Sequence, residues 1–199
     1  MIVYGSSRRS NLNPLWVLIG LNVILFIVTL IDQDVIFLLG FQPATFFSQP
    51  WTIVSNLFIH GGFWHIIANM ITLYFFGSNL FKLVGENKFL AVYFIGGIVG
   101  NILFMLLASP YAVAVGASGA VFALGGALAV MRPKLRVLVF PIPAPLPLWS
   151  VVISAFVILI VVPSMAWQAI AWQAHLGGLI VGLIAGYFFK NSERRFAFI

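Results

Sequence analysis

The chain has ten basic and four acidic residues, and their positions leave four long stretches without any charge. These stretches cover residues 10–31, 35–81, 89–131 and 137–189. A helix that crosses a membrane needs about 20 mostly apolar residues. Because 62% of the chain is hydrophobic and 7% is charged, against roughly 25% charged in a soluble domain, a soluble fold could not bury this apolar surface. The sequence excludes a soluble or disordered protein and predicts an all-α polytopic membrane protein.

Turn and proline residues inside the stretches place the breaks between the predicted spans. Pro110 and Gly116 divide the third stretch, and Pro163 divides the fourth. The proline-rich segment 141–147 cannot be the interior of a helix. We therefore predict a bundle of six transmembrane helices in one domain covering 1–199, with the spans at 15–31, 63–81, 89–108, 118–131, 148–162 and 174–189.

The lysines and arginines predict the orientation of this bundle. All ten fall on one side of a six-span arrangement, whereas the other side carries only Asp32 and Asp34. The positive-inside rule places both termini in the cytoplasm, with residues 1–14 as a short tail and the chain in a cytoplasmic (inner) cell membrane. The segment 35–59 is apolar but interrupted by glycine and proline, and we expect it to be a partly helical first loop in the outer interface.

Several classes of site are excluded by what the sequence lacks. Without cysteine there is no disulfide and no thiolate chemistry. The net charge of +6 does not indicate nucleic acid, because the basic residues are few and lie at the ends of apolar runs. There is no HExxH motif for zinc and no acidic pair within the spans, which excludes the other classes of intramembrane protease. We expect neither a metal nor a cofactor. A channel would need polar residues along the whole membrane depth, and here they are confined to the outer third.

Polar residues on three predicted spans lie at one depth. Ser118 is 14 residues from Arg132, His175 is 15 from Lys190, and Asn69 is 13 from Lys82. At about 1.5 Å per residue, each lies roughly 20 Å from the inner boundary. His65 shares a helix face with Asn69, one turn nearer the outer side.

This set supplies the groups for nucleophilic catalysis. Ser118 is the candidate nucleophile, and His175 is the base that takes its proton. Asn69 and His65 could donate hydrogen bonds to an oxyanion, together with the unpaired backbone N–H of Ser118 at a helix start. Because no carboxylate lies near, we predict a Ser-His dyad.

Small residues predict close packing of the two helices that carry the dyad. Gly178 and Gly182 repeat at intervals of four in the last span, and Gly119 begins a similar series in the fourth. Such faces let membrane helices approach closely, which would bring His175 to Ser118.

Three motifs give the chain a resemblance to the rhomboid family of intramembrane serine proteases. Residues 116–119 read GASG and match the family's GxSG, with Gly116 as its first glycine. Residues 60–69 match HxxxxHxxxN, and residues 174–182 match AHxxGxxxG. The resemblance implies that Ser118 and His175 are catalytic, and that His65, Asn69 and the Ser118 amide form the oxyanion hole. It also implies that the connection 163–173 is a mobile cap over a site open to the outer face.

We interpret His60, and two positions where this chain departs from the family pattern, as structural. We expect His60 to tie the first loop to the second span. The family often has Trp-Arg where this chain has Trp51-Thr52, and often a glutamate where it has Phe81. Both positions look structural in the family.

The sequence therefore predicts a serine endopeptidase that cleaves other membrane proteins within or beside their transmembrane segments. Its partners would be transmembrane substrates and membrane lipids, with no obligate partner protein. The alternative is a catalytically inactive rhomboid-like protein that binds and escorts membrane clients. Such relatives usually lack the serine or the histidine, and both are present here.

Overall fold

The computed structural model describes residues 13–139, 142–165 and 170–196, without the side chains of 160–165 and 193–196. Helices lie at all six ranges predicted as spans: α1 (Pro14–Ile31), α4 (Phe63–Val84), α5 (Glu86–Leu107), α6 (Ser118–Met131), α7 (Leu148–Met165) and α8 (Trp172–Phe196). The predicted tail lies almost entirely outside the described residues, as does the middle of the predicted cap, 166–169.

Within the described residues, four helices are long and apolar enough to cross a membrane, namely α1, α4, α5 and α8. The chain is therefore a multi-pass helical membrane protein. Helix α6 has 14 residues, which makes it about 21 Å long, against a hydrocarbon core of about 30 Å. The apolar part of α7 whose side chains are described, Leu148–Leu159, is also short. That α6 and α7 complete a set of six spans stays a prediction.

Residues at the helix ends explain where two of the helices begin. Asn13 precedes α1 and accepts a hydrogen bond on its Oδ1 from the amide of Leu15 (3.0 Å), while Pro14 occupies the first helical position. Between α4 and α5 the chain turns on Gly85, whose φ of 81° favours glycine.

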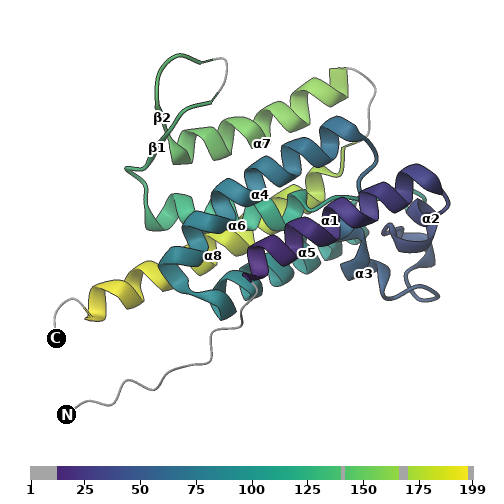
Figure 1. Cartoon of the computed structure of the whole chain (residues 1–199), viewed down its shortest axis with the longest axis horizontal. Coiled ribbons are helices and arrows are strands. Elements are labelled where there is room, and N and C mark those ends of the chain that lie inside the picture. Colours follow the sequence, from purple (N-terminus) through teal and green to yellow (C-terminus); the bar gives the residue numbers. More distant parts are fainter. Residues whose placement is uncertain (1–12, 140–141, 166–169, 197–199) are drawn as a thin grey trace, which may run out of the picture.

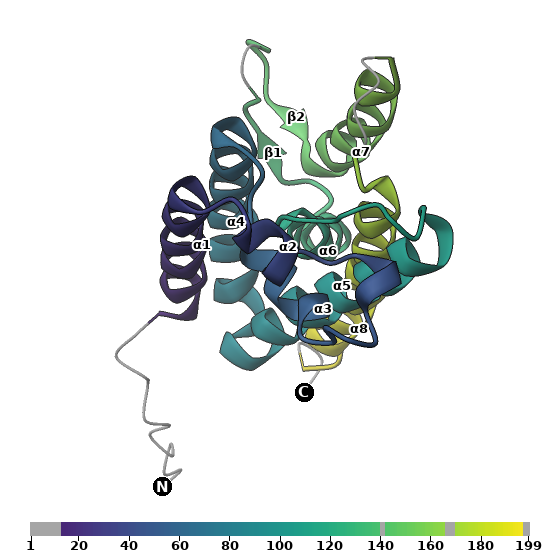
Figure 2. The same ribbon diagram turned by 90° about the vertical axis from the view of Figure 1, so that its right-hand side faces the viewer.

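Helix α6 lies at the centre of the molecule, with the other long helices around it (Figure 2). Twelve of its 14 residues are buried. It lies against the backbone of α8, because a methyl group at Gly178 or Gly182 would overlap the carbonyl oxygen of Gly119 or Ala123. Because glycine has no side chain, the backbones of α6 and α8 are in direct contact.

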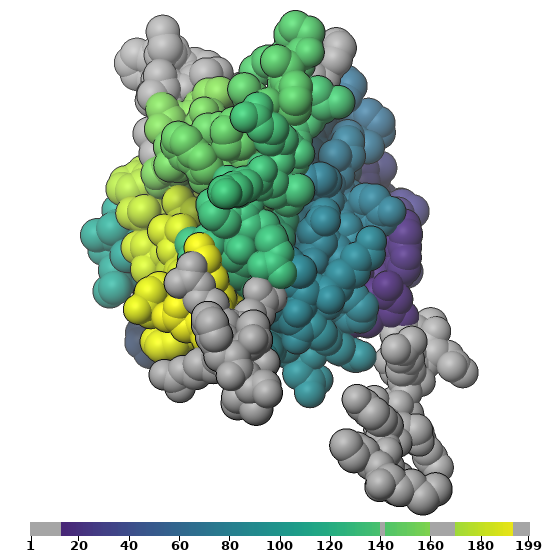
Figure 3. Space-filling view, turned by 90° about the vertical axis from the view of Figure 1, so that its left-hand side faces the viewer, coloured from purple at the N-terminus to yellow at the C-terminus, as the bar shows by residue number. Residues whose placement is uncertain are grey.

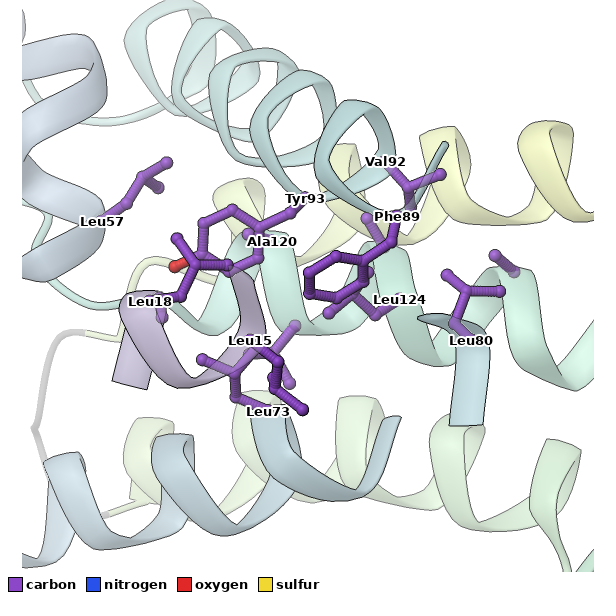
Figure 4. Close-up of a cluster of buried hydrophobic side chains, with 14 of the residues drawn as sticks. Leu15, Leu18, Leu57, Leu73, Leu80, Phe89, Val92, Tyr93, Ala120 and Leu124 are labelled. Atoms are coloured by element: carbon purple, nitrogen blue, oxygen red, sulfur yellow. The ribbon is translucent and has the colours of Figure 1, made fainter. Parts of the chain in front are cut away.

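A cluster of buried apolar side chains attaches α1, α4 and α5 to α6 (Figure 4). Its labelled members are Leu15, Leu18, Leu57, Leu73, Leu80, Phe89, Val92, Tyr93, Ala120 and Leu124. Phe81, where the family often has glutamate, packs edge to face on Phe89 with ring centroids 5.8 Å apart. Apolar packing thus occupies the position of that carboxylate, and dispersion contacts hold these helices together.

The first loop forms four short helices, α2 (Val35–Leu39), η1 (Pro43–Thr45), α3 (Thr52–Ser55) and η2 (Asn56–Phe58). Helices α2 and α3 lie at the end of the bundle opposite the carboxyl end of α8 (Figure 1). The Trp51 side chain donates to the carbonyl of Leu38 (3.0 Å), and the buried Thr52 hydroxyl donates to that of Gln49 (2.6 Å). Hydrogen bonds within the loop therefore anchor the position where the family often has arginine.

The other end of the bundle carries a small hairpin that the sequence did not lead us to expect. Strands β1 (Arg136–Val137) and β2 (Leu146–Pro147) pair antiparallel, with Arg136 opposite Pro147. The space-filling view of this end shows the loop after α6 next to the end of α8 and to α4 and α5 (Figure 3). Helix α7 also runs three residues beyond its predicted end at Val162.

Candidate active site

Ser118 is the first residue of α6, at the point where an extended segment turns into the helix. Gly116 makes this turn with a φ of 114°, a backbone conformation that residues with a side chain rarely adopt. Ala117 follows as the cap residue, and its carbonyl accepts the amide of Val121 at 2.9 Å. Helix geometry leaves the amides of the first turn, including that of Ser118, without an intrahelical acceptor. An N–H donor and the Ser118 hydroxyl are thus presented together.

His175 comes from the first turn of α8 and lies directly against Ser118. The Oγ of Ser118 is 2.7 Å from the Nε2 of His175, and His175 is 5% exposed. The glycine contacts between α6 and α8 produce this distance, because the two side chains project from neighbouring turns of the packed helices. When Nε2 accepts a hydrogen bond from the Ser118 hydroxyl, the single proton of the neutral ring resides on Nδ1.

The Nδ1 atom of His175 has no hydrogen-bond partner among the described residues. Among the described residues, the site therefore contains a serine-histidine pair. The sequence predicted a pair because no acidic residue is expected near Ser118 and His175.

Phe122 contacts the imidazole of His175 and was not singled out from the sequence. The two ring centroids are 4.9 Å apart and the rings are inclined by 32°. Phe122 lies one turn after Ser118 on α6, so the i, i+4 relation could have indicated it. Its ring limits how the imidazole can rotate.

His65 and Asn69 approach the same place from α4. A methyl group at Gly116 would lie 2.7 Å from the Nε2 of His65, so this ring lies directly beside the turn that leads to Ser118. Asn69 is 5% exposed, and its Nδ2 donates to the carbonyl of His65 at 2.9 Å. One Nδ2 hydrogen of Asn69 therefore remains for another acceptor.

His60 is fully buried and packs its ring against that of His65, with centroids 5.0 Å apart. Neither ring nitrogen makes a well-formed hydrogen bond among the described residues. Burial, with a contribution from His65, lowers the pKa of His60 to about 3, although the backbone of Phe58 partly opposes this shift. His60 is thus a neutral ring between the first loop and α4.

Two buried asparagines that the sequence analysis did not single out connect the first loop to the same turn. Asn56 in η2 and Asn101 in α5 are hydrogen-bonded to each other, and the amide of Gly116 donates to the carbonyl of Asn56 at 2.9 Å. They are 45 residues apart, and no sequence period relates them.

Chemically, the site combines a hydroxyl next to an imidazole with N–H donors close by. In the part of the chain that the structure describes, no group of three or more His, Cys, Asp or Glu side chains is placed to hold a metal. Such an arrangement suits proton transfer from the hydroxyl to the imidazole, coupled to attack on an electrophilic carbonyl.

Comparison with known proteins identifies the family. A sequence profile of the rhomboid domain matches residues 48–192. The Rhomboid-like protease 3 of Toxoplasma gondii is 30% identical over 189 residues, which are 89% of this chain and 70% of that protein. The Putative rhomboid protease YdcA of Bacillus subtilis is 30% identical over 158 residues, which are 79% of this chain and 76% of that protein.

A longer relative is Rhomboid protein 1, mitochondrial, of Saccharomyces cerevisiae, 25% identical over 190 residues. These residues are 92% of this chain and 55% of the yeast protein, so the chain spans about half of that relative. The profile covers most of the chain, including both members of the serine-histidine pair and the three motifs. This protein therefore belongs to the rhomboid family.

Proposed function

We propose that this protein is a serine endopeptidase that cleaves other membrane proteins within or beside their transmembrane segments. The observation that carries the proposal is the 2.7 Å distance between Ser118 Oγ and His175 Nε2. It lies within the range of a hydrogen bond from a hydroxyl to an imidazole. A protein that only escorts membrane clients needs no such pair.

In the proposed reaction, Ser118 Oγ attacks the carbonyl carbon of the scissile peptide while His175 Nε2 accepts the hydroxyl proton. The tetrahedral intermediate then loses the amine as its C–N bond breaks, and His175 returns the proton to the leaving nitrogen. Water, activated by the same imidazole, hydrolyses the resulting ester and regenerates the Ser118 hydroxyl.

The negative oxygen of the intermediate needs donors already in place. The Ser118 amide, the remaining Nδ2 hydrogen of Asn69 and the His65 ring are the proposed donors. Two observations support this: His65 lies against Gly116, and the Asn69 Nδ2 donates once within α4. The small residues 116–120 favour substrates with a small side chain just before the scissile bond.

We further propose that both termini face the cytoplasm and that the site opens to the outer face. The described basic residues in the last turn of α4, in the first turn of α5 and in the loop after α6 lie at the end of the bundle opposite α2 and α3 (Figure 1). This distribution is the one that the positive-inside rule associates with the cytoplasmic side.

The test is labelling of the purified protein with a fluorophosphonate probe, which reacts with an activated serine as fluoride leaves phosphorus. Wild type should be labelled, and Ser118→Ala and His175→Ala should lose the labelling while keeping the wild-type unfolding temperature within a few degrees. Labelling that survives Ser118→Ala would exclude Ser118 as the nucleophile. A folded wild type that does not react would favour the client-binding alternative.

A further inference from the structure

A pair of buried asparagines lies next to the site without touching the reacting groups. Asn56 in η2 and Asn101 in α5 are each 2% exposed. Asn56 Nδ2 donates to Asn101 Oδ1 at 3.1 Å, and Asn101 Nδ2 donates to Asn56 Oδ1 at 2.8 Å. A reciprocal amide pair has one preferred geometry, so it fixes the first loop relative to α5.

The other hydrogens of this pair bond to backbone carbonyls around it. Asn101 Nδ2 also donates to the carbonyl of Ile53 at 2.8 Å, and Asn56 Nδ2 reaches that of Ala114 at 3.4 Å. Each amide has two N–H groups, so all four hydrogens of the pair have an acceptor. A buried polar network that is satisfied in this way is rigid, and removing one member leaves the others without partners.

The pair is joined through the backbone to the segment that precedes Ser118. The amide of Gly116 donates to the carbonyl of Asn56 at 2.9 Å. Two residues earlier, Ala114 and Phe41 exchange backbone hydrogen bonds of 2.9 and 2.8 Å. The segment 114–116 is therefore held by the first loop at both of its ends, and the peptide bonds that follow it lead directly to Ser118.

We propose that Asn56 and Asn101 act together as positioning residues for the Gly116–Ser118 backbone. They set the direction of the Ser118 amide and the placement of its Oγ relative to the substrate carbonyl. The inference rests on the proposed protease activity. Because neither side chain contacts the reacting atoms, loss of the pair shifts the oxyanion donor rather than removing it.

The experiment compares the rate of fluorophosphonate labelling in Asn56→Ala, Asn101→Ala and the double variant. Probe concentration is varied so that the limiting rate constant is separated from the apparent binding constant. We expect the limiting rate constant to fall about tenfold with little change in binding, less than the 10²–10³-fold loss typical when an oxyanion donor is removed. The double variant should be no slower than the slower single variant, because the two side chains act as one unit.

A matched control is Asn22→Ala in α1. Asn22 is also fully buried, but its Nδ2 donates to the carbonyl of Leu18 in its own helix (2.8 Å). This variant should lower the unfolding temperature and leave the labelling rate per folded molecule unchanged. If Asn101→Ala does not fold, Asn101→Ser, which keeps a polar group at this position, replaces it in the same comparison.

The outcomes separate this inference from the proposed function. If the asparagine variants are less stable but their folded fraction reacts at the wild-type rate, the pair is only structural and the inference is wrong. Effects of the two single variants that multiply in the double variant would also overturn it. A wild type that is folded and unreactive would instead contradict the proposed function itself.

Discussion

At the scale of single residues, the site depends on missing side chains as much as on reactive ones. Gly116 provides the backbone conformation that turns the chain into α6, and its missing Cβ leaves room for the ring of His65. The three motifs and the uniform depth of the polar residues were enough to predict Ser118, His175, His65 and Asn69 as candidates. The Asn56–Asn101 pair could not be predicted, because its contact depends on how the first loop folds back on α5.

Gly116→Ala should reduce fluorophosphonate labelling at least a hundredfold. The new methyl group would lie 2.7 Å from His65 Nε2, and the backbone strain adds roughly 1–3 kcal/mol. Gly85→Ala separates the two effects, because Gly85 also has a positive φ but its Cβ would meet open space. We expect Gly85→Ala to lower stability and keep the labelling rate. Equal labelling by Gly116→Ala and wild type would contradict this reading of the turn.

His60 should make the protein sensitive to acid. Its folded pKa of about 3 lies below the unfolded value of 6.5, so the unfolded chain binds the additional proton first. The protein is therefore most stable against unfolding above pH 6.5, where His60 is neutral in both states. Stability is lost as the pH falls from 6.5 towards 3, at up to about 1.4 kcal/mol per pH unit.

The variant that tests this is His60→Phe, which keeps the ring and removes two nitrogens without well-formed hydrogen bonds. Urea unfolding between pH 7 and 4 should show a shallower loss of stability than in wild type. At pH 7 its stability should equal or exceed that of wild type. An unchanged pH slope would assign the acid sensitivity to other groups.

At the scale of elements, the contact between α6 and α8 determines the distance between the proposed nucleophile and base. It consists largely of backbone, with Gly178 and Gly182 of α8 against Gly119 and Ala123 of α6. The spacing of four in both helices predicted this contact. The hairpin of β1 and β2 was not predictable in the same way, because two-residue strands have no recognisable period.

Gly182→Ala should separate the two helices and weaken the Ser118–His175 hydrogen bond. Its methyl group would overlap the Ala123 carbonyl, and such overpacking typically costs about 1–3 kcal/mol. We expect a lower unfolding temperature in detergent and a labelling rate reduced more than tenfold. The control Ile184→Phe also adds volume to α8, but at a position that is 53% exposed. Comparable effects of the two variants would show that the helix contact has no special importance.

At the scale of the whole molecule, the described basic residues and the first loop lie at opposite ends of the bundle (Figure 1). The number and approximate bounds of the helices followed from charge-free length and from prolines, because a helix in lipid must satisfy its own backbone. The position of α6 at the centre of the other long helices could not be predicted from its sequence. An apolar helix of 14 residues looks the same whether lipid or protein surrounds it.

The absence of cysteine from the chain allows a direct test of orientation. Single cysteines replacing Asp34 and Tyr111 should react with a membrane-impermeant maleimide on intact cells. Cysteines replacing Lys82 and Lys134 should react only after the membrane is permeabilised, because the positive-inside rule places them in the cytoplasm. Labelling of the Lys134→Cys variant on intact cells would reverse the proposed orientation.

The burial of α6 has a consequence for how the bilayer acts on this protein. None of its residues is exposed, so α6 has no lipid boundary of its own and no hydrophobic mismatch with the acyl chains. A thicker or thinner bilayer changes the tilt of helices that do contact lipid, and these surround α6. Acyl-chain length should therefore affect how a client helix reaches the protein more than it affects the chemistry at Ser118.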